Sequence, residues 1–150
     1  MKTPDIIKLI SDTLRGNVAD NAHMYLWVTN NFLLDGHKVM DRLGFKYKTM
    51  ITWIKISEEG KGNIGLGQYF RGVTEHCLFG VKGILPYKIN RDTGKRMQGR
   101  TGFYAPKEKH SKKPIEMRQM IETVSYPPFL EMFARDEPER ENWSYHGNEK

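Results

Sequence analysis

Residues 24–29, with the sequence Met-Tyr-Leu-Trp-Val-Thr, form a short apolar run that is rich in aromatic and branched side chains. Such a run predicts a β-strand that is buried on both faces. A helix is predicted directly after it, because Asn30 or Asn31 can cap the helix and Gly44 can end it. Its apolar side chains share one face, which consists of Phe32, Leu33, Val39, Met40 and Leu43. A strand followed by a helix is the repeating unit of an α/β domain.

Three further strands and two further helices are predicted from the same kinds of pattern. The strands cover residues 47–56, 76–81 and 129–134, and the helices begin at Thr3 and Pro114. Strands that alternate with crossover helices indicate an α/β domain with a largely parallel sheet. We expect a single domain over residues 1–150, because a chain of this length buries one ordinary core.

The composition is that of an ordinary globular domain. With 38% hydrophobic and 28% charged residues, the chain is neither a disordered segment nor a membrane protein. No apolar run approaches the roughly 18 residues of a spanning helix, and residues 1–5 lack the features of a secretory signal. We therefore expect a cytoplasmic protein without a membrane partner. The single cysteine, Cys77, excludes an internal disulfide, and one thiol with scattered histidines is too little for a structural zinc site.

Two long connections interrupt the order of strands and helices. One is a glycine-rich loop over residues 57–74, and the other is a basic loop over residues 83–112. Long connections inside compact domains are usually binding or gating loops, so we expect function there. The glycine run at 60–67 could cradle a phosphate through its backbone N–H groups. It lacks the spacing of a Walker motif, so a flexible loop is the favoured interpretation.

The excess positive charge is confined to one segment. The whole chain carries 24 Lys+Arg and 18 Asp+Glu, a net charge of +6. Residues 82–113 contain ten basic and two acidic residues, a net of +8, so the rest of the chain sums to −2. Lys and Arg neutralise phosphates and aromatic rings stack on bases, so this segment with Tyr87, Phe103 and Tyr104 fits single-stranded DNA or RNA. The candidate contacts are Lys88, Arg91, Lys95, Arg96, Arg100, Lys107 and Lys109. The alternative is a solvated basic loop.

Two polar groups stand where ligands commonly bind. Glu75 and His76 precede a predicted strand, and residues 110–114 (His-Ser-Lys-Lys-Pro) precede a predicted helix. Open α/β sheets gather ligand-binding residues at such ends, and a lysine at a helix start could bind a carboxylate. Each group taken alone is a weak signal that an ordinary surface usually explains. Trp27 is expected in the core, whereas Trp53, near a strand end, could be core or the wall of a base-stacking pocket.

Five blocks of sequence occur in the order and spacing of one protein family. They are residues 25–30 (YLWVTN), 75–83 (EHCLFGVKG), 110–114 (HSKKP), 130–135 (LEMFAR) and 143–149 (WSYHGNE). The chain resembles the adenine N6-methyltransferases typified by the S-adenosyl-L-methionine (SAM)-binding subunit of eukaryotic mRNA adenosine methyltransferase. That family has phage and bacterial DNA-modifying relatives. The resemblance covers nearly all 150 residues and implies a Rossmann-like SAM-dependent methyltransferase fold with permuted motifs.

The resemblance also implies roles for individual residues. Lys113 would approach the methionyl carboxylate of SAM, because a cation opposite a carboxylate is a sensible pairing. On and just after the late strand, Glu131, Phe133 and Arg135 would border the ribose and the cofactor pocket. Near the C-terminus, Asn148 and Glu149 would reach the ribose and adenine.

One motif of the family is absent. Members carry Asp-Pro-Pro-Trp or a close variant, which holds the adenine N6 amine near the methyl group, and the 150 residues contain no such tetrapeptide. The family's order places it just upstream of the segment that matches Met1. We therefore expect a fold that is incomplete at the N-terminus, and very low activity of the chain alone. A homodimer or a complementing methyltransferase subunit could cover the sheet edge left unpaired.

Three functions follow as alternatives. The first is a SAM-dependent adenine N6-methyltransferase domain that acts on DNA or RNA. The second is a non-catalytic nucleic-acid-binding subunit that keeps the fold and the basic surface. The third is a truncated domain without activity of its own. No residue of the chain is assigned a catalytic role.

Overall fold

The computed structural model describes residues 2–14, 19–56, 69–84, 87–108, 112–133 and 139–146. The helices in these ranges are α1 (Thr3–Leu14), α2 (Leu33–Arg42) and α3 (Ile115–Val124), with a 3-10 turn, η1 (Asn30–Phe32), before α2. The strands are β1 (Ala22–Val28), β2 (Lys46–Ile56), β3 (Thr74–Lys82), β4 (Gly102–Pro106), β5 (Phe129–Met132) and β6 (Trp143–His146). None of the described helices is long and apolar enough to cross a membrane.

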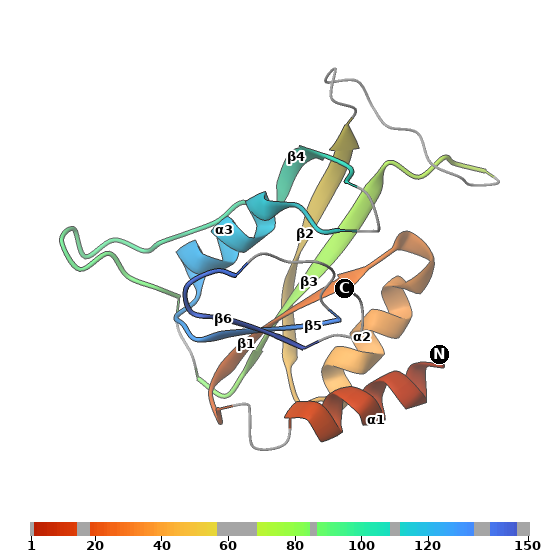
Figure 1. The fold of residues 1–150 in the computed structure, drawn as a ribbon, viewed down its shortest axis with the longest axis horizontal. Helices are drawn as coiled ribbons and strands as arrows, with labels where there is room; N and C mark the ends of the chain where they lie inside the picture. The colour runs from red at the N-terminus through yellow and green to blue at the C-terminus, as the bar shows by residue number, and fades with distance from the viewer. Residues whose placement is uncertain are drawn as a thin grey trace.

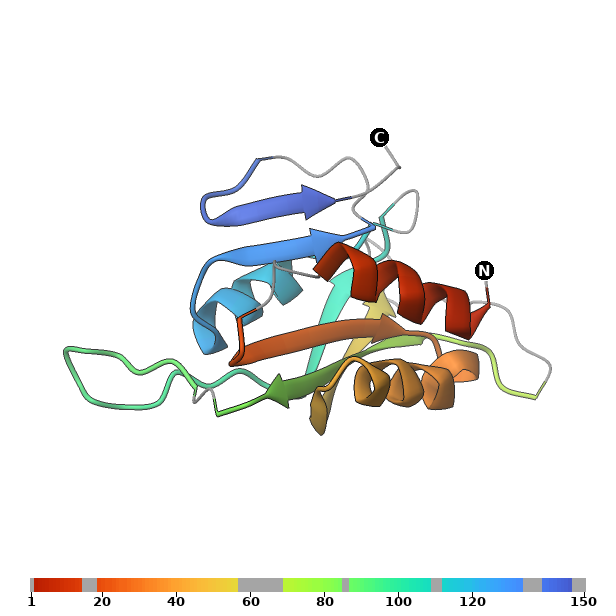
Figure 2. The same cartoon turned by 90° about the horizontal axis from the view of Figure 1, so that it is seen from below.

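The strands form two sheets. The larger sheet has the order β1-β3-β2-β4, in which β3 runs antiparallel to both neighbours and β4 runs parallel to β2. The smaller sheet pairs β5 with β6 in parallel. The two views agree that the smaller sheet lies next to β1 and that β5 and β1 run in the same direction (Figure 1 and Figure 2).

The expectation of a largely parallel sheet is wrong for the part of the chain that the structure describes. Two of the three pairings in the larger sheet are antiparallel, because β3 lies between β1 and β2 and runs the opposite way. A central strand that is covered on both faces shows the same continuous apolar run in either direction. Hydrophobicity therefore identifies the strand and leaves its direction undetermined, and the observed sheet is mixed.

Helices cover both faces of the larger sheet, with α2 on one side and α3 on the other (Figure 2). Adjacent residues of β3 point to opposite faces, so that Leu78 packs in the cluster that contains Met40 of α2 and Cys77 packs with Met117 of α3. Gly80 allows α2 to approach closely, because a Cβ at this position would lie 2.6 Å from Met40 Sδ. Burial raises the pKa of the Cys77 thiol, so this cysteine is a neutral core residue. Burial on both faces explains the unbroken apolar run of β3.

The predicted strands at 24–29, 47–56 and 76–81 are confirmed as β1, β2 and β3, with ends shifted by one or two residues. The predicted helices that begin at Thr3 and Pro114 are confirmed as α1 and α3. These elements depend mainly on local apolar pattern, which is why the sequence predicts them well.

The helix between β1 and β2 is also confirmed, but its predicted start is wrong. Neither Asn30 nor Asn31 caps α2, because both lie in the preceding 3-10 turn and no side chain caps either helix start. The Asn30 side chain instead contacts Thr74 and His76 on β3. Gly44, with a φ of 86°, follows the last turn of α2 as expected.

The segment predicted as a basic loop contains regular structure. Residues 88–97 form a hairpin with an antiparallel bridge between Ile89 and Arg96, and we call it the basic hairpin. Residues 102–106 form β4. This strand escaped prediction because Gly102 and Pro106 are poor strand formers that a sheet edge tolerates. Residues 57–68 of the glycine-rich loop and residues 109–111 lie outside the described ranges.

The late strand, predicted over residues 129–134, forms over the first four of them as β5. It does not join the larger sheet in the described residues but pairs with β6. The apolar pattern of residues 129–132 indicates a strand, whereas its partner depends on which other edge reaches it.

Candidate functional site

One end of the larger sheet brings together charged side chains from three parts of the chain. Lys113, just before α3, donates to Glu75 Oε2 on β3 at 2.8 Å, and Lys55 on β2 lies 3.5 Å from Glu75 Oε1. We call these three residues the strand-end group. The Glu75 side chain is only 12% exposed, so its charge is largely shielded from solvent by its neighbours. Two ammonium groups and one carboxylate leave a net positive charge, which favours an anionic ligand.

Two indole rings form the apolar side of the strand-end group. The Nζ of Lys113 lies 5.2 Å from the ring centroid of Trp27, and the Nζ of Lys55 lies 5.2 Å from that of Trp53. Trp27 is partly buried and packs on the core cluster under α3, which confirms its expected place. Trp53, left open by the sequence, is a core residue, because it is 2% exposed and its Nε1 donates to the Ala105 carbonyl at 2.8 Å. The rings help to hold both lysines in place through cation–π attraction.

His76 lies next to Glu75 along β3 and is held from two sides. Its Nδ1 is 2.9 Å from the Thr52 hydroxyl, and its Nε2 hydrogen-bonds to Asn30 Oδ1. The Asn30 amide nitrogen donates to Thr74, which leaves Oδ1 as the acceptor for a proton on His76 Nε2. Burial lowers the pKa of His76, and the charge of Glu75 opposes this effect. His76 is therefore mainly a neutral imidazole at pH 7, and its side chain connects β3 to β2 and to η1.

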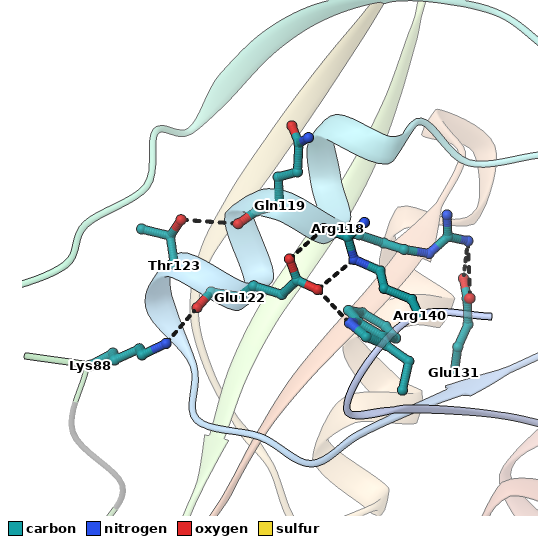
Figure 3. Close-up of polar contacts among 8 residues, drawn as sticks. Lys88, Arg118, Gln119, Glu122, Thr123, Glu131 and Arg140 are labelled. Atoms are coloured by element: carbon teal, nitrogen blue, oxygen red, sulfur yellow. Dashed lines mark hydrogen bonds and ion pairs between the residues drawn. The ribbon is translucent and has the colours of Figure 1, made fainter. Parts of the chain in front are cut away.

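Glu131 on β5, a predicted cofactor residue, is bound by an arginine of α3. Arg118 Nη2 lies 3.2 and 3.1 Å from the two carboxylate oxygens of Glu131 (Figure 3). The Arg118 side chain is 6% exposed, and its guanidinium lies 6.0 Å from the ring centroid of Trp143 on β6. A charged pair that is this well enclosed fixes the position of the Glu131 carboxylate.

A second ion pair lies one turn further along α3. Arg140 donates from Nε and from Nη2 to the two oxygens of Glu122, at 2.6 Å each, and Trp143 Nε1 donates to Glu122 Oε2 at 2.7 Å (Figure 3). The hydrogen bond from Arg140 is the main reason that the pKa of Glu122 is lowered. Together with the Arg118 pair, this contact attaches the smaller sheet to α3.

The sequence analysis did not single out Arg118, Glu122 or Arg140. Arg118 and Glu122 are four residues apart and so share one face of a helix, which was an available signal. Their partners, Glu131 and Arg140, lie on later segments, and nothing in the local pattern of α3 indicates either pairing. Lys55 was also missed, although its place at the end of a strand matched the rule that drew attention to Glu75.

The remaining predicted cofactor residues are only partly described. Phe133 is 50% exposed, has a φ of 59°, and donates its backbone N–H to the His146 carbonyl at 2.6 Å. Arg135, Asn148 and Glu149 lie outside the described residues. The cofactor roles of all six candidates stay predictions.

The basic hairpin is attached to the end of α3 and projects away from the sheet (Figure 1). Lys88 anchors it, because its backbone N–H donates to the Val124 carbonyl at 2.9 Å and its Nζ donates to the Glu122 carbonyl at 3.2 Å. Arg96 lies over Tyr87, with its guanidinium carbon 4.6 Å from the ring centroid. Arg91 and Lys95 are exposed near the turn, where their charges face solvent.

The structure separates the predicted nucleic-acid contacts into two places. Arg100 lies between the basic hairpin and the start of β4, whereas Lys107 follows the end of β4. The five residues of this strand span about 16 Å. Lys107 therefore lies toward the strand-end group, and Lys109 lies outside the described residues.

A mixed sheet with helices on both faces and charged side chains at its strand ends defines a mixed α/β domain. A family model described as MT-A70 matches residues 3–149. The chain therefore belongs to the MT-A70 family, which confirms the resemblance inferred from the five sequence blocks.

Relatives of the chain include both catalytic and non-catalytic proteins by name. A putative N(6)-adenosine-methyltransferase MT-A70-like protein of Medicago truncatula is 29% identical over 129 residues, which are 84% of this chain and 20% of the relative. The N(6)-adenosine-methyltransferase non-catalytic subunit METTL14 of Xenopus tropicalis is 27% identical over 150 residues, 93% of this chain and 31% of the relative. The human catalytic subunit METTL3 is 28% identical over 133 residues, 87% of this chain and 22% of the relative. The chain thus spans about a fifth to a third of these relatives.

Proposed function

We propose that this chain is a SAM-dependent N6-adenine methyltransferase domain that acts on DNA or RNA. The observation that carries the proposal is the 2.8 Å contact between Lys113 and Glu75. These residues belong to two separate sequence blocks of the family pattern, and they meet in one charged site at the strand ends. Family membership supports the reaction, and the contact supports the place of the cofactor.

The residues of the strand-end group fit the amino-acid part of SAM. A methionyl group carries one carboxylate and one ammonium, and the strand-end group offers the ammonium groups of Lys55 and Lys113 and the carboxylate of Glu75. Opposite charges at hydrogen-bonding distance are the stronger polar pairings in proteins. Trp27 adds an apolar wall beside Lys113. When bound, SAM supplies an electrophilic methyl group on its sulfonium.

Glu131 fits the ribose of the same cofactor. Arg118 holds its carboxylate from one side, and the oxygens keep lone pairs that can accept hydrogen bonds from ribose hydroxyls. Phe133 follows on the same strand and is exposed enough to contact a ligand. The proposed roles of Arg135, Asn148 and Glu149 rest on the resemblance alone.

We also propose that methyl transfer requires a segment that supplies Asp-Pro-Pro-Trp, which the 150 residues lack. In the described part of the chain β1 pairs only with β3, and β5 pairs only with β6. Because β1 and β5 lie beside each other and run the same way, a parallel strand between them could pair with both (Figure 2). A further segment of a longer polypeptide or a complementing subunit can provide that strand with its tetrapeptide, whereas a second copy of these 150 residues can only cover the strand edges.

The second candidate function is a non-catalytic nucleic-acid-binding subunit. The similarity to a relative named as a non-catalytic subunit favours it, as do the exposed cations Arg91 and Lys95 on the basic hairpin. A phosphate backbone is attracted to such a surface whether or not methyl transfer occurs.

Calorimetric titration with SAM and with S-adenosylhomocysteine tests the first proposal. Binding that is lost in Lys113→Ala and kept in Lys95→Ala supports the cofactor site, because both variants lose one lysine charge. An unchanged affinity in Lys113→Ala contradicts the assigned site. Binding to DNA or RNA without any binding of SAM favours the second candidate.

A further inference from the structure

A cavity of about 210 Å³ lies between the larger sheet and α3, away from the strand-end group. Its walls are mostly apolar and come from Tyr25, Ile51 and Phe79 on the sheet and from Met117 and Met120 on α3. The segment from 97 to 101, which connects the basic hairpin to β4, also lines it. None of the three residues of the strand-end group lines it.

The mouth of this cavity is surrounded by positive charge. Tyr87 lines the cavity, and the guanidinium of Arg96 lies over its ring at 4.6 Å. Arg100 also lines the cavity and is exposed. Residues 87–101 contain five basic residues and a single acidic one, Asp92. The ligand expected here therefore has an apolar part that enters the cavity and a negatively charged part that stays outside, near the arginines.

We propose that the cavity binds one unpaired nucleobase of a single strand whose phosphates lie along the basic hairpin. The base is flat and largely apolar on its faces, which suits the aromatic and methionine walls. Its polar edge can meet the side chains of Thr49, Gln98 and Thr101, which also line the cavity. An apolar peptide side chain could fill the same volume, but it gives no reason for Arg96 and Arg100 at the mouth or for the further cations along the basic hairpin.

This inference rests on the proposed nucleic-acid function and adds a second base site to it. Lys88 links the basic hairpin to the cavity. It anchors the hairpin to the end of α3, the helix that forms one wall of the cavity. The base in the cavity is not the base that is methylated, since the cofactor residues lie at the strand ends. It would instead fix the register of the strand on the protein.

The test compares short DNA and RNA oligonucleotides with versions that carry one abasic position, scanned along the strand at constant salt. The phosphates are unchanged in the abasic versions, so only the loss of a base is measured. We expect one abasic position to lower the affinity about tenfold in fluorescence anisotropy, and the other positions to have small effects. Equal affinity for the intact and all abasic oligonucleotides overturns the base site and leaves charge-driven binding intact. Absence of binding to every oligonucleotide overturns both the base site and the nucleic-acid function.

Thr49→Trp provides the matching protein variant, because it fills the cavity from β2 without changing charge. It should lower the affinity for the intact oligonucleotide to that of the abasic one and remove the difference between them. Thr13→Trp on α1, outside the cavity, should keep both affinities. If Thr49→Trp retains the full difference, the cavity does not hold the base.

Photocrosslinking of the unaltered chain gives a readout that does not depend on the folding of a variant. An oligonucleotide with one thio-substituted pyrimidine at the sensitive position should crosslink to Tyr87, to residues 97–101, or to Met117 and Met120. Crosslinks confined to peptides that do not line the cavity overturn the inference.

Discussion

Lys113 and Glu75 are 38 residues apart in the chain, yet the Nζ of Lys113 lies 2.8 Å from Oε2 of Glu75. This contact joins the start of α3 to the start of β3 and leaves Lys55 at the other carboxylate oxygen. The side chains of the strand-end group are thus held in place partly by the ion pairs that they form with one another. A ligand with a carboxylate and an ammonium can exchange partners with it without leaving a charge unpaired.

Replacing Lys113 by alanine should weaken the binding of SAM and S-adenosylhomocysteine about tenfold to a hundredfold. The loss of one hydrogen bond to a charged group costs about 1.5 to 3 kcal/mol, which corresponds to this range. Calorimetric titration measures it directly. Arg135→Ala and Asn148→Ala should act in the same direction. Equal affinity of the parent and all three variants contradicts the cofactor assignment.

The chain by itself should show no measurable adenine methylation, because it lacks the tetrapeptide that positions the target amine. Mass spectrometry for N6-methyladenine, after incubation with SAM and DNA or RNA, is the measurement. Activity should appear when the chain is co-purified with a segment of a family member that carries Asp-Pro-Pro-Trp. Activity of the chain alone that disappears in Lys113→Ala would show that another group performs the missing role.

Replacing Arg91, Lys95, Arg96 and Arg100 by serine should weaken nucleic-acid binding and flatten its salt dependence. Each lost phosphate contact reduces the log-log slope by roughly 0.7 on single strands. A matched control replaces Lys2, Lys8, Lys38 and Arg42, which are exposed on or near α1 and α2 and carry the same total charge. The control should retain the parent slope, and thermal melts of both variants should be similar to that of the parent. If the parent and the serine variant of the basic hairpin bind equally at every salt concentration, the hairpin is a solvated surface that does not contact nucleic acid.

The Glu122–Arg140 pair should make the stability of the fold depend on pH in the acid range. The pKa of Glu122 is lowered from 4.5 in the folded chain, chiefly by the hydrogen bond from Arg140. Its contribution is therefore fully present above about pH 4.5 and is lost as the pH falls through the lower folded pKa. Urea unfolding of the parent and of Glu122→Gln should differ at neutral pH and converge in acid. If the difference in unfolding free energy between the parent and Glu122→Gln is the same at every pH, it arises from packing and not from the charge of Glu122.

The sequence by itself determined the elements with strong local patterns. Residues 24–29 and 76–81 are apolar because both of their faces are covered, and this requirement can be read without knowing the partners. The five motif blocks were likewise sufficient for the family, because their order and spacing are properties of the chain. Glu75 and Lys113 were singled out for the same reason, since each stands at the end of a predicted element.

Tertiary structure alone decided which of these elements meet. The antiparallel direction of β3, the pairing of β5 with β6, and β4 with its terminal Gly102 and Pro106 depend on the neighbouring edge rather than on the local run. The contact of Lys55 with Glu75 and that of Arg118 with Glu131 likewise join residues on separate elements. Local sequence restricts backbone conformation and burial, whereas the energy of a hydrogen bond or ion pair exists only once folding has brought its two partners together.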